Sequence, residues 1–217
     1  ASGDRGGYVH IWNAETMKQI GEPLVAHREI NPDEFFSPDN STIWTWDIEF
    51  SPDGKFLATS ASDKTLIIWD VETLRPVSQM IHDTDNVAAI SYSETEQTDW
   101  LRAISFTPDG KKLISGSYDS SIIIWDVERE ERLVTFFGAT NFPVRALAVN
   151  NNGKILAIGF GDGTISLWDL ENQEYIQEVI GEHASAITKL SFSADDNFLF
   201  SSGQDGLVQE WDIESFA

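Results

Sequence analysis

The sequence contains no cysteine. This absence excludes disulfide bonds, thiolate zinc ligands and cysteine nucleophiles. No apolar run approaches the roughly 18 residues that indicate a membrane-spanning helix. The opening residues, ASGDRGGYVH, have neither the basic start nor the apolar stretch of a signal peptide. Since 41% of the residues are hydrophobic, as in ordinary globular proteins, we expect a folded chain. The lack of cysteine is compatible with a reducing compartment, and we expect a cytoplasmic protein.

Basic residues are also scarce. The chain has 14 lysines and arginines against 36 aspartates and glutamates, so its formal net charge is −22 at pH 7. A field of this sign repels nucleic acid and anionic lipid surfaces. We therefore expect neither a nucleic acid nor a membrane as the partner, and we interpret the acidity as a source of solubility.

A tryptophan followed by Asp or Asn recurs along the chain. Five short segments end in this pair: YVHIWN (8–13), TLIIWD (65–70), SIIIWD (121–126), TISLWD (164–169) and LVQEWD (207–212). The tryptophans, at positions 12, 69, 125, 168 and 211, are 57, 56, 43 and 43 residues apart. Self-similarity with a period of about 40–45 residues is typical of the blades of a propeller.

Two further features repeat in phase with the tryptophans. An aspartate lies six residues before four of them (Asp63, Asp119, Asp162 and Asp205), and Gly6 takes that place in the first copy. Turn sequences also recur between alternating apolar runs, as SPDGK (51–55), TPDGK (107–111), NNNGK (150–154) and SADDN (193–197). Such spacing predicts antiparallel hairpins. No window has a 3.6-residue period, so no long helix is expected.

The whole pattern resembles the WD-repeat β-propeller family, and the resemblance covers essentially the entire chain. It implies an all-β fold of four-stranded antiparallel blades around a central channel. The repeats end near residues 13, 70, 126, 169 and 212. We expect inner strands at 44–50, 101–106, 144–149 and 186–192, and second strands at 56–61, 112–117, 154–160 and 198–203. Third strands carry the Trp-Asp pairs, and outer strands are expected at 18–25, 75–81, 132–137 and 175–180.

The resemblance also implies a structural tetrad in each repeat: a histidine, a serine or threonine, the turn aspartate and the tryptophan. Two sets are complete, His27, Thr59, Asp63 and Trp69, and His183, Ser201, Asp205 and Trp211. A third set has Ser115, Asp119 and Trp125, with His82 or Gln97 as the first member. The set with Asp162 and Trp168 has Ala139 and Ile158 in place of the histidine and serine, so we expect apolar packing there.

One tetrad has the composition of a hydrolase triad. His183, Ser201 and Asp205 combine the residue types of a nucleophile, a base and an orienting carboxylate. A matching set recurs at His27, however, and repetition is typical of structural residues rather than of a single active site. The four histidines show no metal-ligand spacing. We therefore predict no enzyme activity, no cofactor and no metal site.

Two connections are longer than the others, at about 28–43 and 83–97, and in a propeller they emerge on one face, called the top. Aromatic residues lie in or beside them, including Phe35, Phe36, Trp44 and Trp100. The resemblance implies two partner-binding positions per blade. The first set is Trp46, Arg102, Arg145 and Thr188, and the second includes Arg5, Tyr118 and Gln204. We predict a protein or peptide partner, bound through an acidic or aromatic segment. Two alternatives stay open: the aromatics pad the blade tops, and each arginine pairs with a carboxylate.

The function that the resemblance implies is a non-catalytic scaffold or sensor that binds a protein partner on its top face. A second interpretation is a regulatory or substrate-binding propeller of a larger multidomain enzyme, with an NTPase, kinase or protease-like module. A weaker one is a structural subunit of a large assembly. Family rings most often have seven blades, so the four to five blades counted here predict a piece of a larger ring. Completion by a partner chain or a second copy, and closure of five blades, remain alternatives.

Overall fold

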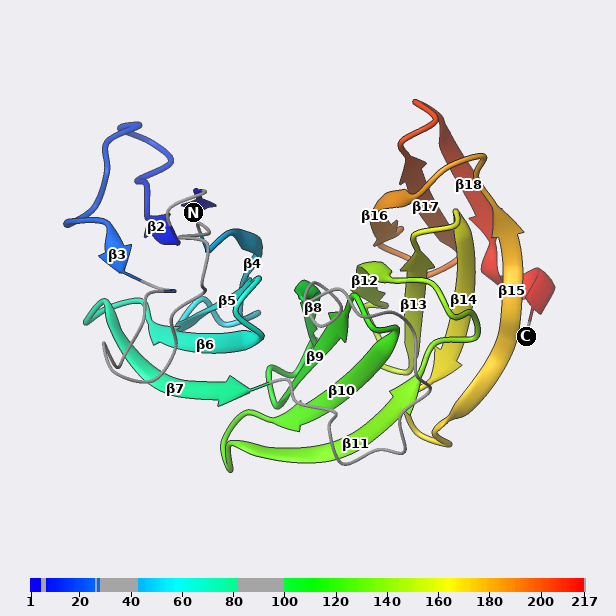
Figure 1. The fold of residues 1–217 in the computed structure, drawn as a ribbon, viewed down its shortest axis with the longest axis horizontal. Helices are drawn as coiled ribbons and strands as arrows, with labels where there is room; N and C mark the ends of the chain where they lie inside the picture. Colours follow the sequence, from blue (N-terminus) through cyan, green and yellow to red (C-terminus); the bar gives the residue numbers. More distant parts are fainter. Residues whose placement is uncertain (5–6, 26, 28–42, 82–99, 217) are drawn as a thin grey trace, which may run out of the picture.

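Five antiparallel β-sheets, arranged as an arc, make up the described part of the protein (Figure 1). The structure, a computed structural model, describes residues 1–216 apart from 5–6, 26, 28–42 and 82–99. Within that part the only helix is the short 3-10 helix η1 (Ile213–Phe216). Three sheets have four strands and two have three, and the first and last sheets stand at the two ends of the arc. The expected all-β propeller of four-stranded blades is confirmed.

The strands follow one another through the sheets in chain order. The first sheet holds β1 (Ser2–Gly3), β2 (Tyr8–His10) and β3 (Leu24–Val25). The second holds β4 (Thr45–Phe50), β5 (Phe56–Ala61), β6 (Thr65–Asp70) and β7 (Arg75–Ile81). The third holds β8 (Leu101–Phe106), β9 (Lys112–Ser117), β10 (Ser121–Asp126) and β11 (Glu131–Phe137). The fourth holds β12 (Val144–Val149), β13 (Ile155–Phe160), β14 (Thr164–Asp169) and β15 (Glu174–Glu182). The fifth holds β16 (Ile187–Phe192), β17 (Phe198–Gly203) and β18 (Val208–Asp212).

The predicted inner and second strands agree with the observed ones to within one residue, because alternating apolar residues and turn sequences fix their ends. The first sheet differs from the prediction in two ways. Its outer strand, expected at 18–25, is regular only at Leu24–Val25, with an isolated bridge between Trp12 and Gln19. The chain also contributes two residues of a second strand, since Ser2 and Gly3 pair with His10 and Val9.

The hydrophobic core lies between consecutive sheets. In the second, third and fourth sheets, three positions on one face pack against the next sheet; they lie eleven, three and one residues before the repeated tryptophan. In the second, third and fourth sheets these residues are Ala58, Leu66 and Ile68; Ile114, Ile122 and Ile124; and Ala157, Ile165 and Leu167. The opposite face of each of these sheets carries the tryptophan toward the preceding sheet. Consecutive sheets thus bury each other, and this packing places β4, β8, β12 and β16 side by side around the centre of the arc.

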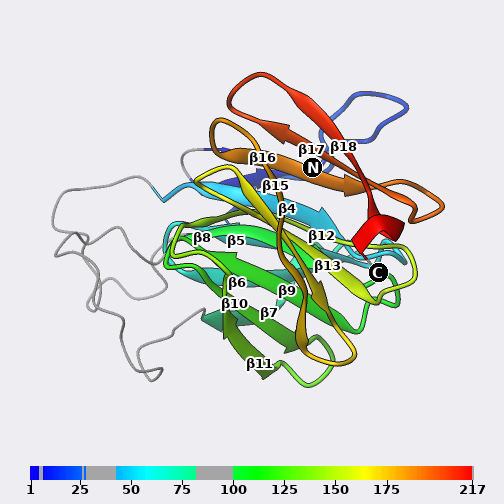
Figure 2. The ribbon, with the colours of Figure 1, turned by 90° about the vertical axis from the view of Figure 1, so that its right-hand side faces the viewer.

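The strands run across the thickness of the molecule between two faces (Figure 2). The inner strands begin at the top face, which also holds the turns that contain the repeated aspartate. At the opposite, bottom face lie the hairpin turns at 51–55, 107–111, 150–154 and 193–197, where Asp53, Asp109 and Asp195 accept hydrogen bonds from the hydroxyl groups of Ser51, Thr107 and Ser193. The sequence pattern therefore assigns each turn to a face.

The outer face of the last sheet differs from the equivalent faces before it. Phe200, Val208 and Glu210 occupy the positions that are Ala157, Ile165 and Leu167 in the fourth sheet. Val208 is 73% exposed and Phe200 is 37% exposed, whereas Ile165 and Ala157 at the equivalent positions are fully buried. No described residue covers this face.

Candidate functional site

A chain of hydrogen bonds crosses the second sheet from the tryptophan to the turn aspartate. Trp69 Nε1 donates to Thr59 Oγ1 over 3.1 Å, and Thr59 Oγ1 lies 3.0 Å from His27 Nε2. His27 Nδ1 lies 2.8 Å from Thr65 Oγ1 and 3.5 Å from Asp63 Oδ1. Thr65 in turn donates to Asp63 through its hydroxyl and its backbone N–H. The structure thus brings all four predicted members together and adds Thr65.

The fifth sheet repeats the chain with shorter links. Trp211 Nε1 donates to Ser201 Oγ over 2.8 Å, and Ser201 Oγ lies 2.7 Å from His183 Nε2. His183 Nδ1 faces both oxygens of Asp205 at 3.1 and 3.0 Å. These three residues have the connectivity of a hydrolase triad. Ser201 is only 1% exposed and its hydroxyl already accepts the tryptophan N–H. An arrangement this buried, and repeated at His27, holds the sheet together rather than presenting a nucleophile.

The hydrogen bonds also set the acidity of the aspartates. The backbone N–H of Leu207, with His183 and the N–H of Ala184, lowers the pKa of Asp205 against the effect of burial. For Asp63, burial raises the pKa, but the bonds and charge of His27 and the two bonds from Thr65 outweigh it, so the pKa is lowered. Both carboxyl groups are therefore held in the ionised, hydrogen-bond-accepting form.

The third sheet has the same link between tryptophan and serine. Trp125 Nε1 donates to Ser115 Oγ over 2.8 Å, and Asp119 accepts from the backbone N–H and hydroxyl of Ser121. The two candidates for the histidine position, His82 and Gln97, lie outside the described residues. The first sheet contains a member that the sequence analysis missed, since Trp12 Nε1 donates to Ser2 Oγ over 3.0 Å. Ser2 lies ten residues before its tryptophan, as Ser115 and Ser201 do.

The fourth sheet lacks the chain, as its substitutions predict. Ile158 takes the serine position, and the buried Trp168 Nε1 has no acceptor among the described residues. The Trp168 ring instead stacks on Phe136 at a centroid distance of 3.8 Å, and Tyr175 meets it edge-on at 4.8 Å. Asp162 still accepts the hydroxyl and N–H of Thr164. Aromatic packing across the sheets therefore stands in for the hydrogen bonds.

A β-bulge recurs at the start of every described inner strand. The pairing register shifts between residues 45 and 47, 101 and 103, 144 and 146, and 187 and 189. The extra residues of the four bulges are those predicted for the first binding position: Trp46, Arg102, Arg145 and Thr188. A bulged residue leaves the ladder and its side chain is re-aimed. The four side chains thus stand at equivalent places around the top of the inner strands.

A second repeated contact sets the other predicted position. The residue before each turn aspartate donates its backbone N–H to the residue that precedes the inner strand, in the pairs Ser62–Trp44, Tyr118–Trp100, Gly161–Pro143 and Gln204–Ala186. The donor–acceptor distances run from 2.8 to 3.0 Å. This bond holds the two predicted kinds of position next to each other on the top face. Thr188 and Gln204 are exposed there, and Thr188 Oγ1 donates to the carbonyl of Ser202.

The predicted aromatic residues form a continuous row on the top face. The ring centroids of Trp44 and Trp46 are 5.0 Å apart, those of Trp46 and Trp100 5.7 Å, and those of Trp100 and Tyr118 5.9 Å. All four side chains remain partly accessible. The other predicted members, Arg5, Phe35 and Phe36, lie outside the described residues, as does nearly all of the connections at 28–43 and 83–97.

Arg102 lies against this aromatic row, and the charge of Arg145 acts on Arg102. The Arg102 guanidinium carbon is 3.8 Å from the centre of the Trp46 ring, which is a close cation–π contact. Burial, followed by the positive charge of Arg145, lowers the pKa of Arg102 to about 10. Among the described residues no carboxylate forms an ion pair with either arginine. Within the described residues, therefore, neither arginine shows the pairing that this alternative expects, and the acidic residues of 28–42 and 82–99 lie outside that part of the chain.

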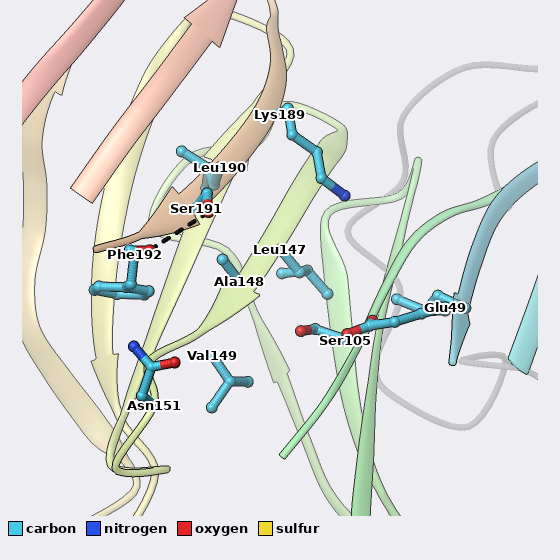
Figure 3. Close-up of a pocket in the computed structure, with 11 residues that line it drawn as sticks. Glu49, Ser105, Leu147, Ala148, Val149, Asn151, Lys189, Leu190, Ser191 and Phe192 are labelled. Atoms are coloured by element: carbon cyan, nitrogen blue, oxygen red, sulfur yellow. Dashed lines mark hydrogen bonds between the residues drawn. The ribbon is translucent and has the colours of Figure 1, made fainter. Parts of the chain in front are cut away.

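A cavity of about 250 Å³ lies lower in the central channel. The inner strands β4, β8, β12 and β16 line it, and Glu49 and Lys189 enter it from the two outermost of these strands (Figure 3). Glu49 accepts the backbone N–H of Phe106 over 3.3 Å, and Asp47 accepts that of Ile104 over 3.0 Å. These carboxylates therefore link β4 to the inner strand of the next sheet. Sequence analysis gave no signal for them.

Glu49 has an unusual acidity. Burial, followed by the charge of Asp47, raises its pKa from 4.5 to about 7, although the N–H of Phe106 and the charge of Lys189 lower it. The four predicted bulge residues do not line this cavity, so the channel interior and the top face are separate features.

Two other kinds of site were sought across the described ranges. Nowhere in them do three histidine, aspartate or glutamate side chains gather so as to hold a metal ion. No helix in the same ranges has the length and apolar character to cross a membrane.

Comparison with known proteins identifies related sequences. Residues 34–70 and 89–126 match the family described as WD domain, G-beta repeat, and residues 129–215 match the Vps8 beta-propeller. The chain is 27% identical over 140 residues to Protein HIR1 of Aspergillus oryzae, covering 62% of this chain and 13% of that protein. It is 33% identical over 93 residues to the WD repeat-containing protein 26 homolog of Drosophila melanogaster, covering 42% and 13%. It is 30% identical over 101 residues to WD repeat-containing protein VIP3 of Arabidopsis thaliana, covering 46% and 31%. The chain thus spans a minor part of these relatives.

Removing the turn aspartates tests the hydrogen-bond chains. We expect Asp63→Ala to lower the free energy of unfolding by about 1–3 kcal/mol, because His27 and Thr65 lose a buried acceptor. Asp205→Ala should lower the melting temperature for the same reason. Asp162→Ala is the matched control, since Ala139 leaves this aspartate without a histidine partner and its loss should cost less. Thermal denaturation measures all three. If Asp63→Ala and Asp205→Ala melt within a degree of the parent, the chains do not stabilise the fold.

The raised pKa of Glu49 predicts a pH dependence of stability. The pKa of Glu49 in the folded state, about 7, exceeds its ordinary value of 4.5. The contribution of the Glu49 carboxyl group to the free energy of unfolding is therefore fully present below about pH 4.5 and is lost as the pH rises through 7. Glu49→Gln keeps an oxygen for the Phe106 N–H and removes the titration. Urea denaturation from pH 4.5 to 8 should therefore show a smaller loss of stability in this variant than in the parent, and the exposed control Glu128→Gln should behave as the parent does. Parallel pH profiles for the parent and Glu49→Gln would contradict the assignment.

Proposed function

The chain belongs to the WD-repeat β-propeller family, and from that premise we propose that it is a scaffold or sensor that binds a peptide segment of a protein partner on its top face. WD-repeat proteins generally act as non-catalytic platforms, which supports the general role. The observation that carries the choice of face is the row formed by Trp44, Trp46, Trp100 and Tyr118, with Arg102 stacked on Trp46. Partly accessible aromatic and arginine side chains are the residues that most often anchor protein interfaces.

The proposed binding surface is composed of residues from several repeats. The bulges supply one side chain each from β4, β8, β12 and β16, and the turns before the aspartates supply the second set. A peptide that crosses the top of the channel would therefore meet chemically different groups in succession: aromatic rings over the second and third sheets, then arginines over the third and fourth. This order favours a partner segment with an apolar side chain beside an acidic one. We propose no catalytic role for these residues, and a cytoplasmic location stays a prediction.

We further propose that another sheet packs on the outer face of the fifth sheet, as part of a larger ring of seven blades. The exposed Phe200 and Val208 support this, because their equivalents in the preceding sheets are buried against a following sheet. Adjoining sequence, a partner chain or a second copy could each supply the covering sheet. If adjoining sequence supplies it, the chain could also be the regulatory or substrate-binding part of a larger enzyme, or a structural subunit of an assembly. The proposed top-face site is compatible with each of these.

Substitution at the bulges tests the binding face. We expect the combined change Trp46→Ala, Arg102→Ala and Arg145→Ala to remove the partners that the parent chain captures from a cell lysate, because it deletes the aromatic and cationic anchors together. The matched control, Lys55→Ala with Lys111→Ala, removes the same amount of charge from turns on the bottom face. Circular dichroism establishes that both variants are folded. A folded triple variant that captures the same partners would overturn the proposal.

Mass spectrometry tests the completion of the ring. The chain has a mass of 24.3 kDa. Under denaturing conditions, material from the natural source should give a larger mass if adjoining sequence supplies the missing sheets. A 24.3 kDa chain that forms a defined oligomer under native conditions would instead indicate completion between chains. A monomer of 24.3 kDa under both conditions would contradict the larger ring.

A further inference from the structure

The inner strands present backbone groups to the central channel. Each of β4, β8, β12 and β16 is an edge strand of its sheet, so every second N–H points away from that sheet. In β8 these are the N–H groups of Ile104 and Phe106. They donate to the carboxylates of Asp47 and Glu49 on β4. A carboxylate held against an inner strand is therefore a contact that this fold already makes.

The two following inner strands offer equivalent N–H groups. The positions of Ile104 and Phe106 recur there as Leu147, Val149, Leu190 and Phe192. The alternation is the same, because Asn150 and Ser193 donate their N–H groups to the second strand, as Thr107 does. The positions that hold Asp47 and Glu49 in β4 are Ala103, Ser105, Ala146 and Ala148 in β8 and β12. None of these four side chains supplies a carboxylate to the strand that follows.

The channel cavity lies where these carboxylates are missing. All four residues with the equivalent N–H groups line it, as do Ser105, Ala148 and Ser191, which hold the position of Glu49. Its volume of about 250 Å³ equals that of roughly eight water molecules, so it has room for a molecule of the size of an amino acid. The small side chains on β8 and β12 thus leave both the space and the donors that an external carboxylate needs.

One positive and one negative side chain face this space from opposite sides (Figure 3). Lys189 enters from β16 and Glu49 from β4. A ligand carboxylate beside Lys189 would gain charge-assisted hydrogen bonds. An ammonium group would be attracted to Glu49, whose neighbour Asp47 adds a second negative charge. A molecule with both groups has no net charge, so the net charge of −22 on the chain does not repel it.

We propose that the central channel binds a small zwitterion of the amino acid class. Its carboxylate lies beside Lys189 and accepts outward N–H groups of β12 and β16, its ammonium group lies beside Glu49, and its side chain contacts Leu147 and Val149. This site is separate from the top face and does not rest on the peptide binding proposed there. Because the ligand binds only the folded chain, it stabilises that chain by mass action, and the scaffold becomes a sensor of a small molecule.

Equilibrium dialysis of the 217-residue chain against a mixture of the common amino acids tests this proposal. We expect one or a few of them to be retained. The same compound without its amino group, or without its carboxylate, should bind at least about tenfold more weakly, because each loss removes a charge-assisted contact. Lys189→Met should weaken binding to a similar extent, whereas the bottom-face control Lys55→Met should leave it unchanged.

A second variant inserts the missing carboxylate. Ser105 holds the position of Glu49, so Ser105→Glu should place its carboxylate against the N–H of Val149 and exclude the ligand. Circular dichroism establishes that the variant is folded. The triple alanine variant of the top face should retain the ligand while it loses the captured peptide partners, since its three positions do not line the cavity. This result separates the two proposals.

Three outcomes would overturn the inference. The parent chain could retain no amino acid, so that the channel holds only water. It could retain the compound without its amino group as strongly as the intact one, in which case Glu49 does not select an ammonium group. Finally, Lys189→Met could bind as strongly as the parent chain, which would place the ligand outside this cavity.

Discussion

Burial of apolar side chains between consecutive sheets is the interaction on which the other features depend. Each middle sheet is apolar on both faces, with residues such as Ile122 and Ile124 on one side and Trp125 on the other, so it needs a neighbour on each side. Because the sheets are twisted and pack face to face, successive copies fan out around an axis and their first strands meet at the centre. The channel and the meeting of residues from four repeats at its top both follow from this requirement.

The hydrogen-bond chains add to this packing without being indispensable to it. In the fifth sheet the chain runs unbroken from Trp211 to Asp205, whereas the fourth sheet keeps the tryptophan but offers its N–H no acceptor within the described structure. An orphaned buried indole N–H is costly, and the stacking of Phe136 on Trp168 at 3.8 Å offsets part of that cost. The sheet keeps its four strands and its place in the arc. Apolar packing between the sheets therefore determines the architecture, and the hydrogen-bond chains add stability to individual sheets.

The sequence predicts this fold well because each strand is marked twice, by alternation and by turn residues at a fixed distance from a tryptophan. The apolar character of the fourth sheet could be predicted for the same reason, from Ala139 and Ile158 in two polar positions. Ser2 has the spacing of its equivalents but stands in an incomplete copy. Glu49 and Lys189 come from distant repeats, and only the ring brings them into one channel. The contact of Arg102 with Trp46 depends on side-chain directions at two bulges, which alternation alone does not encode.

The bulges separate the demands of folding from those of recognition. A residue that belongs to the ladder must suit its cross-strand partners and the sheet stacked against it, and the inner strands are accordingly alike from copy to copy. The bulged residue is released from these demands, and the four copies carry Trp, Arg, Arg and Thr at that one place. Such positions can be substituted while the framework around them is held by its own packing. A propeller built in this way can present different side chains at the top of its channel without a change in its sheets. Related chains could therefore acquire new partners through substitutions at a few bulge positions.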